Sequence, residues 1–162
     1  MTDVVAFVTN YLSQRDRSRI AFDWNGKHAD EFRDASDPFR RAVIEHVLEN
    51  PSAVPIKLVR DLYDAETAWA NEAWCVNAEA VSALAEELLV RGGPEFVEDF
   101  LVGKTGRGMD AYCSARFDCP RGLAERLLAE VNRRLVDAEG TRRTVLEAGR
   151  DIFQRWIENA QT

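Results

Sequence analysis

The chain has 162 residues, of which 46% are hydrophobic and 30% are charged, and its formal net charge at pH 7 is −7. This length suits one domain with a buried core, and this composition excludes an intrinsically disordered chain. The acidic balance disfavours nucleic acids and anionic membrane surfaces as partners, while it is compatible with a basic partner. Residues 1–162 are therefore predicted to form a single domain.

The N-terminal residues and the hydrophobic runs predict a cytoplasmic protein with no membrane-spanning segment. No stretch approaches the roughly 18 consecutive apolar residues that a spanning helix needs. The first three residues carry no basic side chain, and the apolar run 4–8 is too short for a signal peptide. The chain has three cysteines, which are Cys75, Cys113 and Cys119. An odd number of cysteines fits reduced thiols better than a set of disulfide bonds.

Apolar residues recur at helical spacing along almost the whole chain, so the predicted class is all-α, with about seven or eight helices. The first helix is expected from Thr2 to about Gln14. Residues 15–37 mix arginines with aromatic residues and turn at Asn25-Gly26, with a short helix expected at 29–35. Asp37-Pro38 is a strong start for the next helix, which ends at residues 50–51.

The second half of the chain shows clear start and stop signals. Asn77 is expected to cap a helix that ends at Gly92-Gly93, and a long helix is expected from about 120 to 140. The last helix carries an unbroken apolar stripe over Val145–Ile157. Gly149 lies within this stripe, which suggests the close approach of another backbone.

The middle of the chain repeats itself with a period of about 39 residues. The run that begins at Pro55 returns at Pro94, and 94 − 55 = 39. Residues 73–75 return as 111–113, and residues 84–89 return as 123–128. Three matches in the same order predict one helical hairpin present twice, over about 55–93 and 94–132, with flanking capping helices.

The period, the proline at the head of each first helix and the paired helices resemble the HEAT and armadillo class of helical repeats. The resemblance covers about Pro55 to Val131, and it concerns the fold class without pointing to one family. It implies an α–α superhelix whose concave side commonly grips another protein. A compact helical bundle is the alternative architecture.

The Gly-Lys-Thr sequence at 103–105 is shared with phosphate-binding loops, but the remaining signature is missing. The first glycine of that motif would fall at Glu98, and the preceding segment is helical instead of a strand. We therefore predict no nucleotide site and no cofactor. Three nearby glycines instead predict a mobile surface loop in which Lys104, Arg107 and Arg116 bind an anionic group or partner. A solvated connection between helices is the alternative.

Two tryptophans are candidate contact residues. Trp69 and Trp74 are about 140° apart on an ideal helix, so they do not both point into one core face. An exposed tryptophan on a helical array often marks a protein contact. Alternatively, each ring packs against a different neighbouring helix.

No residue pattern assembles a catalytic or metal site. Cys113 and Cys119 are six residues apart, with no Cys-x-x-Cys pair beside them, and the cysteines are expected to be small buried residues, above all Cys75 and Cys113. Several carboxylates crowd one predicted helix. One of them could act as a general acid or base, or all of them could form the exposed face of an amphipathic helix. These residues are Asp61, Asp64, Glu66 and Glu72.

Together these observations predict a non-enzymatic module that binds another protein. A basic partner fits the charge, and at its most specific the chain would neutralise a basic toxin, as immunity proteins do. A second hypothesis is an uncharacterised enzyme with an acidic or mixed-charge groove. A third is a self-associating structural protein, a homodimer in which the Val145–Ile157 helix pairs between copies.

Overall fold

The computed structural model of the protein describes residues 2–73 and 75–160, and nearly all regular structure in this part is α-helical. Eight of the helices in the described part have seven residues or more, which confirms the all-α class and the expected number. The α-helices are α1 (Thr2–Thr9), α2 (Ser13–Asp16), α3 (Asp37–Glu49), α4 (Ile56–Ala73), α5 (Ala78–Gly92), α6 (Val97–Gly106), α7 (Gly108–Ser114), α8 (Arg121–Leu135) and α9 (Gly140–Asn159). Short 3-10 turns are η1 (Arg17–Arg19), η2 (Ala29–Glu31), η3 (Pro51–Ala53) and η4 (Gly93–Phe96).

The predicted start and stop signals lie at helix ends. The Asn77 side chain accepts a hydrogen bond of 3.2 Å from the Ala80 amide, so it caps α5 as expected. Gly93 follows α5 with φ of +64°, a conformation that glycine adopts without strain. Pro38 stands in the first turn of α3, where its missing amide proton is not needed.

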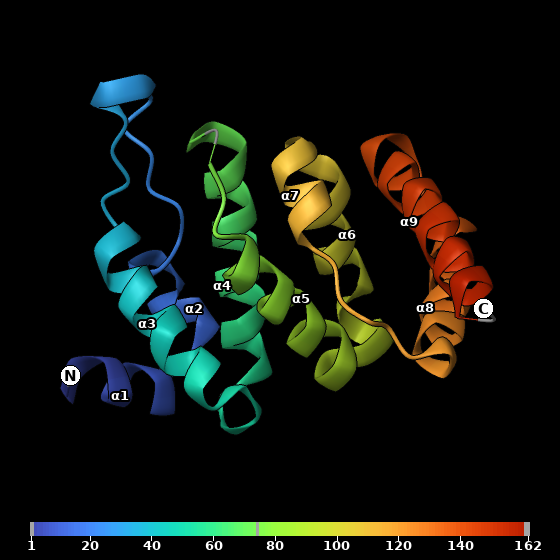
Figure 1. Cartoon of the computed structure of the whole chain (residues 1–162), viewed down its shortest axis with the longest axis horizontal. Coiled ribbons are helices and arrows are strands. Elements are labelled where there is room, and N and C mark those ends of the chain that lie inside the picture. The colour runs from blue at the N-terminus through green and yellow to red at the C-terminus, as the bar shows by residue number, and fades with distance from the viewer. Residues whose placement is uncertain (1, 74, 161–162) are drawn as a thin grey trace.

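Long helices pack in series across the molecule (Figure 1). The helix α4 contacts α5, α6 and α7, then α6 contacts α9, and α9 lies along α8. At the other end α3 contacts α1, α4 and α5. The buried apolar side chains form one cluster that extends from Phe7 in α1 to Phe153 in α9. None of the described helices is long and apolar enough to cross a membrane.

The apolar stripe of α9 is used inside the chain. Leu146, Ile152 and Phe153 are buried, and α9 packs against both α6 and α8. Gly149 faces α6, where its close neighbour is the Leu101 side chain. The sequence had suggested the backbone of another segment at this position. The central residues of the Val145–Ile157 stripe are therefore covered within the chain.

Residues 21–35 form a projecting hairpin, which we call the arm. The expected helix at 29–35 is wrong, because only the single 3-10 turn η2 forms there. Two extended stretches instead pair at an isolated antiparallel bridge between Trp24 and Asp34. Figure 1 shows the arm in blue, rising away from the body of helices at the upper left.

The predicted mobile loop at 103–108 is also wrong. The helix α6 continues to Gly106, and the chain breaks only at Arg107 and Gly108, where φ is +80°. Gly103 lies inside α6, at a position where a Cβ atom would come within 2.5 Å of the Tyr63 ring. The residue is therefore glycine because of this close packing. The glycine spacing that suggested a loop thus reflects close packing of α6 against α4 in addition to one turn.

The cysteines do not follow the expectation of burial. Cys75 and Cys113 are exposed and Cys119 is half-buried. In the short helix α7 the buried position is Ala111, and Cys113 lies on the side that faces solvent. The repeat match at these positions therefore does not identify a shared core position.

The contact between α9 and α6 can be tested with a single methyl group. In Gly149→Ala the new Cβ would overlap the Leu101 side chain, whose Cγ lies 3.1 Å away. We expect the free energy of unfolding to fall by about 1–2 kcal/mol, because the cost of this overlap outweighs the gain in helix propensity of about 1 kcal/mol. Urea unfolding of both proteins measures the difference.

Gly122→Ala in α8 is the matched control, because nothing lies within 4 Å of a Cβ at that position. This variant should be as stable as the parent or slightly more stable. Equal effects of the two substitutions would contradict the close packing of α9 on α6.

Candidate functional site

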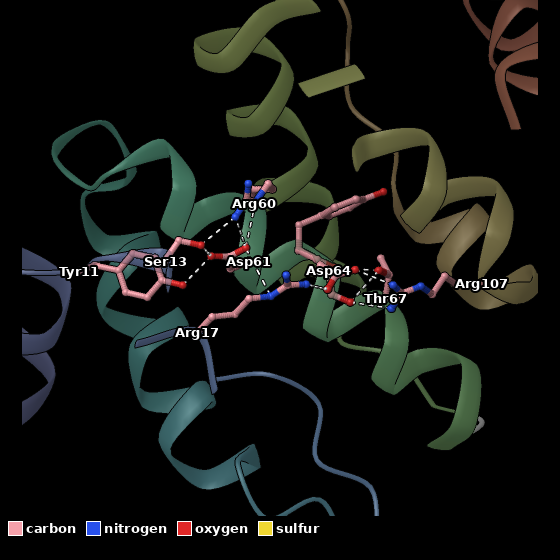
Figure 2. Close-up of polar contacts among 9 residues, drawn as sticks. Tyr11, Ser13, Arg17, Arg60, Asp61, Asp64, Thr67 and Arg107 are labelled. Carbon is pink, nitrogen blue, oxygen red and sulfur yellow. Dashed lines mark hydrogen bonds and ion pairs between the residues drawn. The ribbon is translucent and has the colours of Figure 1, made fainter. Parts of the chain in front are cut away.

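A row of paired charges runs along one face of α4 (Figure 2), and Asp61 is its buried centre. The Asp61 carboxylate accepts a hydrogen bond of 2.6 Å from the Tyr11 hydroxyl and another from the Ser13 hydroxyl. Arg60 donates two further bonds, of 2.9 Å from Nε and 2.7 Å from Nη2. Burial and the bond to this carboxylate raise the pKa of Tyr11, so its phenol keeps its proton.

One turn further along α4, Asp64 joins two other segments of the chain. Its carboxylate lies 2.6 Å from Nη2 of Arg17 in η1 and 2.5 Å from Nη2 of Arg107 at the break between α6 and α7. Arg107 also donates to the backbone carbonyl of Asp64 at 2.9 Å. The row therefore ties the N-terminal segment and the α6–α7 junction to α4, as Figure 2 shows.

These contacts exclude one interpretation of the acidic residues on this helix for Asp61 and Glu66. Asp61 and Glu66 are buried, so they are not on the exposed face of an amphipathic helix. The oxygens of Asp61 and Asp64 accept bonds from side chains of the chain itself. These bonds join separate segments of the chain, so we call Asp61, Asp64 and the side chains bound to them the clasp. Among the described residues, no group of three or more His, Cys, Asp or Glu side chains is placed to hold a metal ion.

A second buried ion pair anchors the arm. Arg40 of α3 has no exposed surface, and its Nε lies 2.7 Å from Glu66 of α4 while its Nη2 lies 2.7 Å from Asp34 of the arm. Asp34 also accepts bonds from the amides of Asp23 and Ser36. One guanidinium thus connects the arm, α3 and α4, which holds the arm in a defined position.

Aromatic rings cover the side of the arm that meets the helices. Phe22 stacks on Trp24 and on Phe32, with ring centroids 6.4 and 6.2 Å apart. Phe32 meets the edge of Trp69 of α4 at 6.5 Å, and the Arg41 guanidinium lies 5.2 Å from the centre of the Trp69 ring. All five side chains are half-buried, so each is fixed on one side and open to solvent on the other.

The structure separates the residues that were predicted to form a binding loop. Lys104 is only 3% exposed, and its ammonium donates to the carbonyls of Tyr112 and Ala115 at 2.7 and 2.8 Å. Arg107 belongs to the clasp on Asp64, and only Arg116 is exposed. The prediction of one positive surface patch was therefore wrong, because carbonyl groups of α7 and of the residue that follows it bind the Lys104 ammonium.

Trp69 is a second predicted site residue, besides Arg116, that is accessible at the surface. It is half-buried against the arm, so it packs on a neighbour and is also accessible. Trp74 lies outside the described residues. Sequence reasoning missed Phe22, Trp24 and Phe32 as contact residues. The available signal was the alternation of aromatic and polar residues at 22–24, which is the pattern of an extended segment with one covered face.

Neither protein families, nor curated proteins, nor solved structures gave a match to this chain.

The clasp on α4 predicts a large loss of stability in Asp61→Asn. The amide would leave Arg60 without its buried counter-charge and would weaken the bonds from Tyr11 and Ser13, at a cost of roughly 3 kcal/mol. Urea unfolding measures the loss. Asp3→Asn is the matched control, because the Asp3–Arg19 ion pair lies on the surface and should contribute little. A similar small effect of both changes would contradict the clasp.

Buried Lys104 predicts a rise in stability at alkaline pH. Burial lowers the pKa of its ammonium from 10.5 to about 8, and the guanidinium groups of Arg116 and Arg155 add to this, whereas Cys113 opposes it. Between these two pKa values the unfolded chain binds the proton and the folded chain does not, so stability increases with pH from about 8 towards 10.5.

Over this pH range the free energy of unfolding should increase by on the order of 1–3 kcal/mol more than in the Lys104→Met variant, whose methionine side chain does not titrate. Urea unfolding of both proteins at pH 7.5, 9 and 10 gives the comparison. Parallel pH profiles for the two proteins would contradict the lowered pKa.

Proposed function

We propose that this chain is a non-enzymatic module that binds another protein through the arm and the adjoining surface of α3 and α4. The observation that supports this function best is the half-exposed aromatic surface formed by Phe22, Trp24 and Phe32 with Trp69. Tryptophan and arginine are enriched among the residues that dominate protein interfaces. Arg41, which lies over Trp69, adds the second of these residue types to the same surface.

The arm is also held in place before any partner arrives. The Asn25 side chain accepts bonds from the amides of Lys27 and Arg33 and donates to the carbonyl of Glu31, so it organises the tip. The Trp24 indole donates to the Lys27 carbonyl at 2.8 Å. Together with the ion pair between Arg40 and Asp34, these bonds reduce the conformational entropy that would be lost on binding.

We also propose that the helices are organised as tandem hairpins of the HEAT or armadillo type. The pair α4–α5 would be the first unit, and η4, α6, α7 and α8 would be the second. In support, α4, α6 and α9 contact one another in series, and Leu84 and Leu123, which occupy matching positions, are both buried. The second unit departs from the first, because its leading helix is broken at Arg107. Such an array would present the arm at one end of an extended surface.

An enzyme is the weaker hypothesis on the same observations. Two of the four candidates for acid–base chemistry, Asp61 and Asp64, accept bonds from Tyr11 and from arginines. A general base needs a free lone pair within reach of substrate. The clasp directs these lone pairs at the chain's own side chains.

Site-specific photo-crosslinking tests the proposed surface. A photoreactive phenylalanine derivative replaces Asp30, an exposed residue at the tip of the arm, and the protein is irradiated in the cells from which the sequence comes. We expect one covalent adduct with another protein, identified by mass spectrometry. The same derivative at Val136, which is 78% exposed at the end of α8, is the matched control and should not form that adduct.

Trp24→Ala in the Asp30-labelled protein should reduce the adduct at least about tenfold, as loss of a central interface aromatic does. Circular dichroism establishes that the helices remain folded. Identical adducts from both labelled positions, or no adduct from the arm, would contradict the proposal. An adduct between two copies of this chain would favour self-association instead.

A further inference from the structure

Two hollows open on either side of α5. The first, of about 210 Å³, lies between α3 and α5, and its lining includes Glu45 and Leu48 from α3 and Glu79 from α5. The second, of about 550 Å³, lies between α5 and the extended segment 115–120, and its charged lining residues are Glu86, Asp118 and Arg116. Apolar side chains contribute to both hollows, with Leu48 in the first and Trp156 in the second.

The exposed ridge of α5 connects the two hollows. Glu79 and Glu86 are seven residues apart, so they lie on the same face of the helix, about 10 Å from each other. Ser82 lies between them on that face and donates a hydrogen bond to the carbonyl of Arg116. The hollows therefore open along one continuous side of the molecule.

Carboxylates on this side have no partner within the described part of the chain. Glu45, Glu79, Glu86 and Asp118 are exposed, and none of them forms a hydrogen bond or an ion pair with a described residue. The acidic residues of the clasp on α4 are paired with arginines, and so is Glu98, which binds Arg134 and Arg142. The negative charge of these four carboxylates is thus not neutralised by direct contact with a described residue of the chain.

We propose that this side of α3, α5 and the segment 115–120 binds a lysine- or arginine-bearing segment of the partner protein; the inference rests on the proposed function. Each hollow offers two carboxylates to a cationic head group, beside one arginine, which is Arg41 in the first hollow and Arg116 in the second. The apolar lining suits the aliphatic stem of the same side chain. Positive charges about 10 Å apart on the partner, as at positions i and i+7 of a helix, match the spacing of Glu79 and Glu86.

The acidic side is continuous with the arm surface. Arg41 lines the first hollow and also lies over the ring of Trp69, which meets Phe32 of the arm. Its guanidinium is held by Asp37 at 2.9 Å, so the cation at this border has its own counter-charge. A single partner could therefore contact aromatic residues at the arm and place its basic residues along α5. Phosphate-rich partners such as nucleic acids and anionic membranes are repelled by the same carboxylates.

A synthetic helical peptide tests this inference without knowledge of the natural partner. The probe has 18 residues, with lysine at positions i and i+7 on one face, and a version with glutamate at those positions is the charge control. Fluorescence anisotropy with the full-length protein measures its dissociation constant. We expect the lysine peptide to bind and the glutamate peptide not to bind, with affinity that falls as salt is added.

The variant Glu79→Lys/Glu86→Lys should raise the dissociation constant at least about tenfold. Glu95→Lys/Glu139→Lys changes two exposed carboxylates elsewhere by the same total charge and should raise it less than about threefold. Circular dichroism of both variants establishes that they are folded. Equal losses in the two variants would overturn the inference, because they would mean attraction to net charge alone.

Failure of the lysine peptide to bind, or binding of duplex DNA or anionic vesicles at the same face, would overturn it as well. The photo-crosslinking result at the arm does not depend on the peptide. An arm adduct without peptide binding would therefore remove the basic-segment inference and leave the protein-binding function standing.

Discussion

The central constraint in this molecule is the burial of charged side chains on α4. Asp61 and Glu66 are both about 1% exposed, and each is compensated by an arginine. Asp61 also accepts bonds from Tyr11 and Ser13, whereas the second carboxylate oxygen of Glu66 has no hydrogen-bond partner among the described residues. Removing two opposite charges from water costs about as much as their attraction returns, so such pairs add little net stability. Leaving one charge without its partner is far more costly, and that asymmetry restricts how the segments around α4 can be placed. Figure 2 shows the outcome for the N-terminal segment and the α6–α7 junction.

The same constraint positions the surface that we propose as the binding site. Arg40 compensates Glu66 on α4 and also binds Asp34, so the arm is fixed to the helix that carries Trp69. Phe32 of the arm then meets Trp69, which also lies beneath the Arg41 guanidinium. A projecting hairpin without this anchor would lose its arrangement of rings in solution, because two short extended stretches are only marginally stable by themselves.

Charge is distributed unevenly over this acidic chain. Arginines neutralise the carboxylates that hold segments together, including Asp61, Asp64 and Glu98. Two exposed carboxylates of α3 and α5, Glu45 and Glu79, have no such partner among the described residues, whereas Asp37 and Glu87 on the same helices are paired with arginines. Net charge favours solubility wherever it lies, whereas a one-sided concentration of unpaired charge selects partners of opposite sign. On this basis we propose that one basic partner contacts both the arm and the acidic side of α5.

Sequence alone determined the helical class, the caps at Asn77 and Gly93 and the apolar stripe of α9, because these depend on local backbone preference and on a period of 3.6 residues. It did not determine which charges would be buried. Lys104 resembled an exposed loop residue, but α7 and the residue that follows it bring two carbonyl groups to its ammonium. Phe32 and Trp69 meet across 37 residues of chain (69 − 32 = 37). Tertiary structure alone decided these features, since the energy of a charge or ring depends on neighbours that local sequence does not specify.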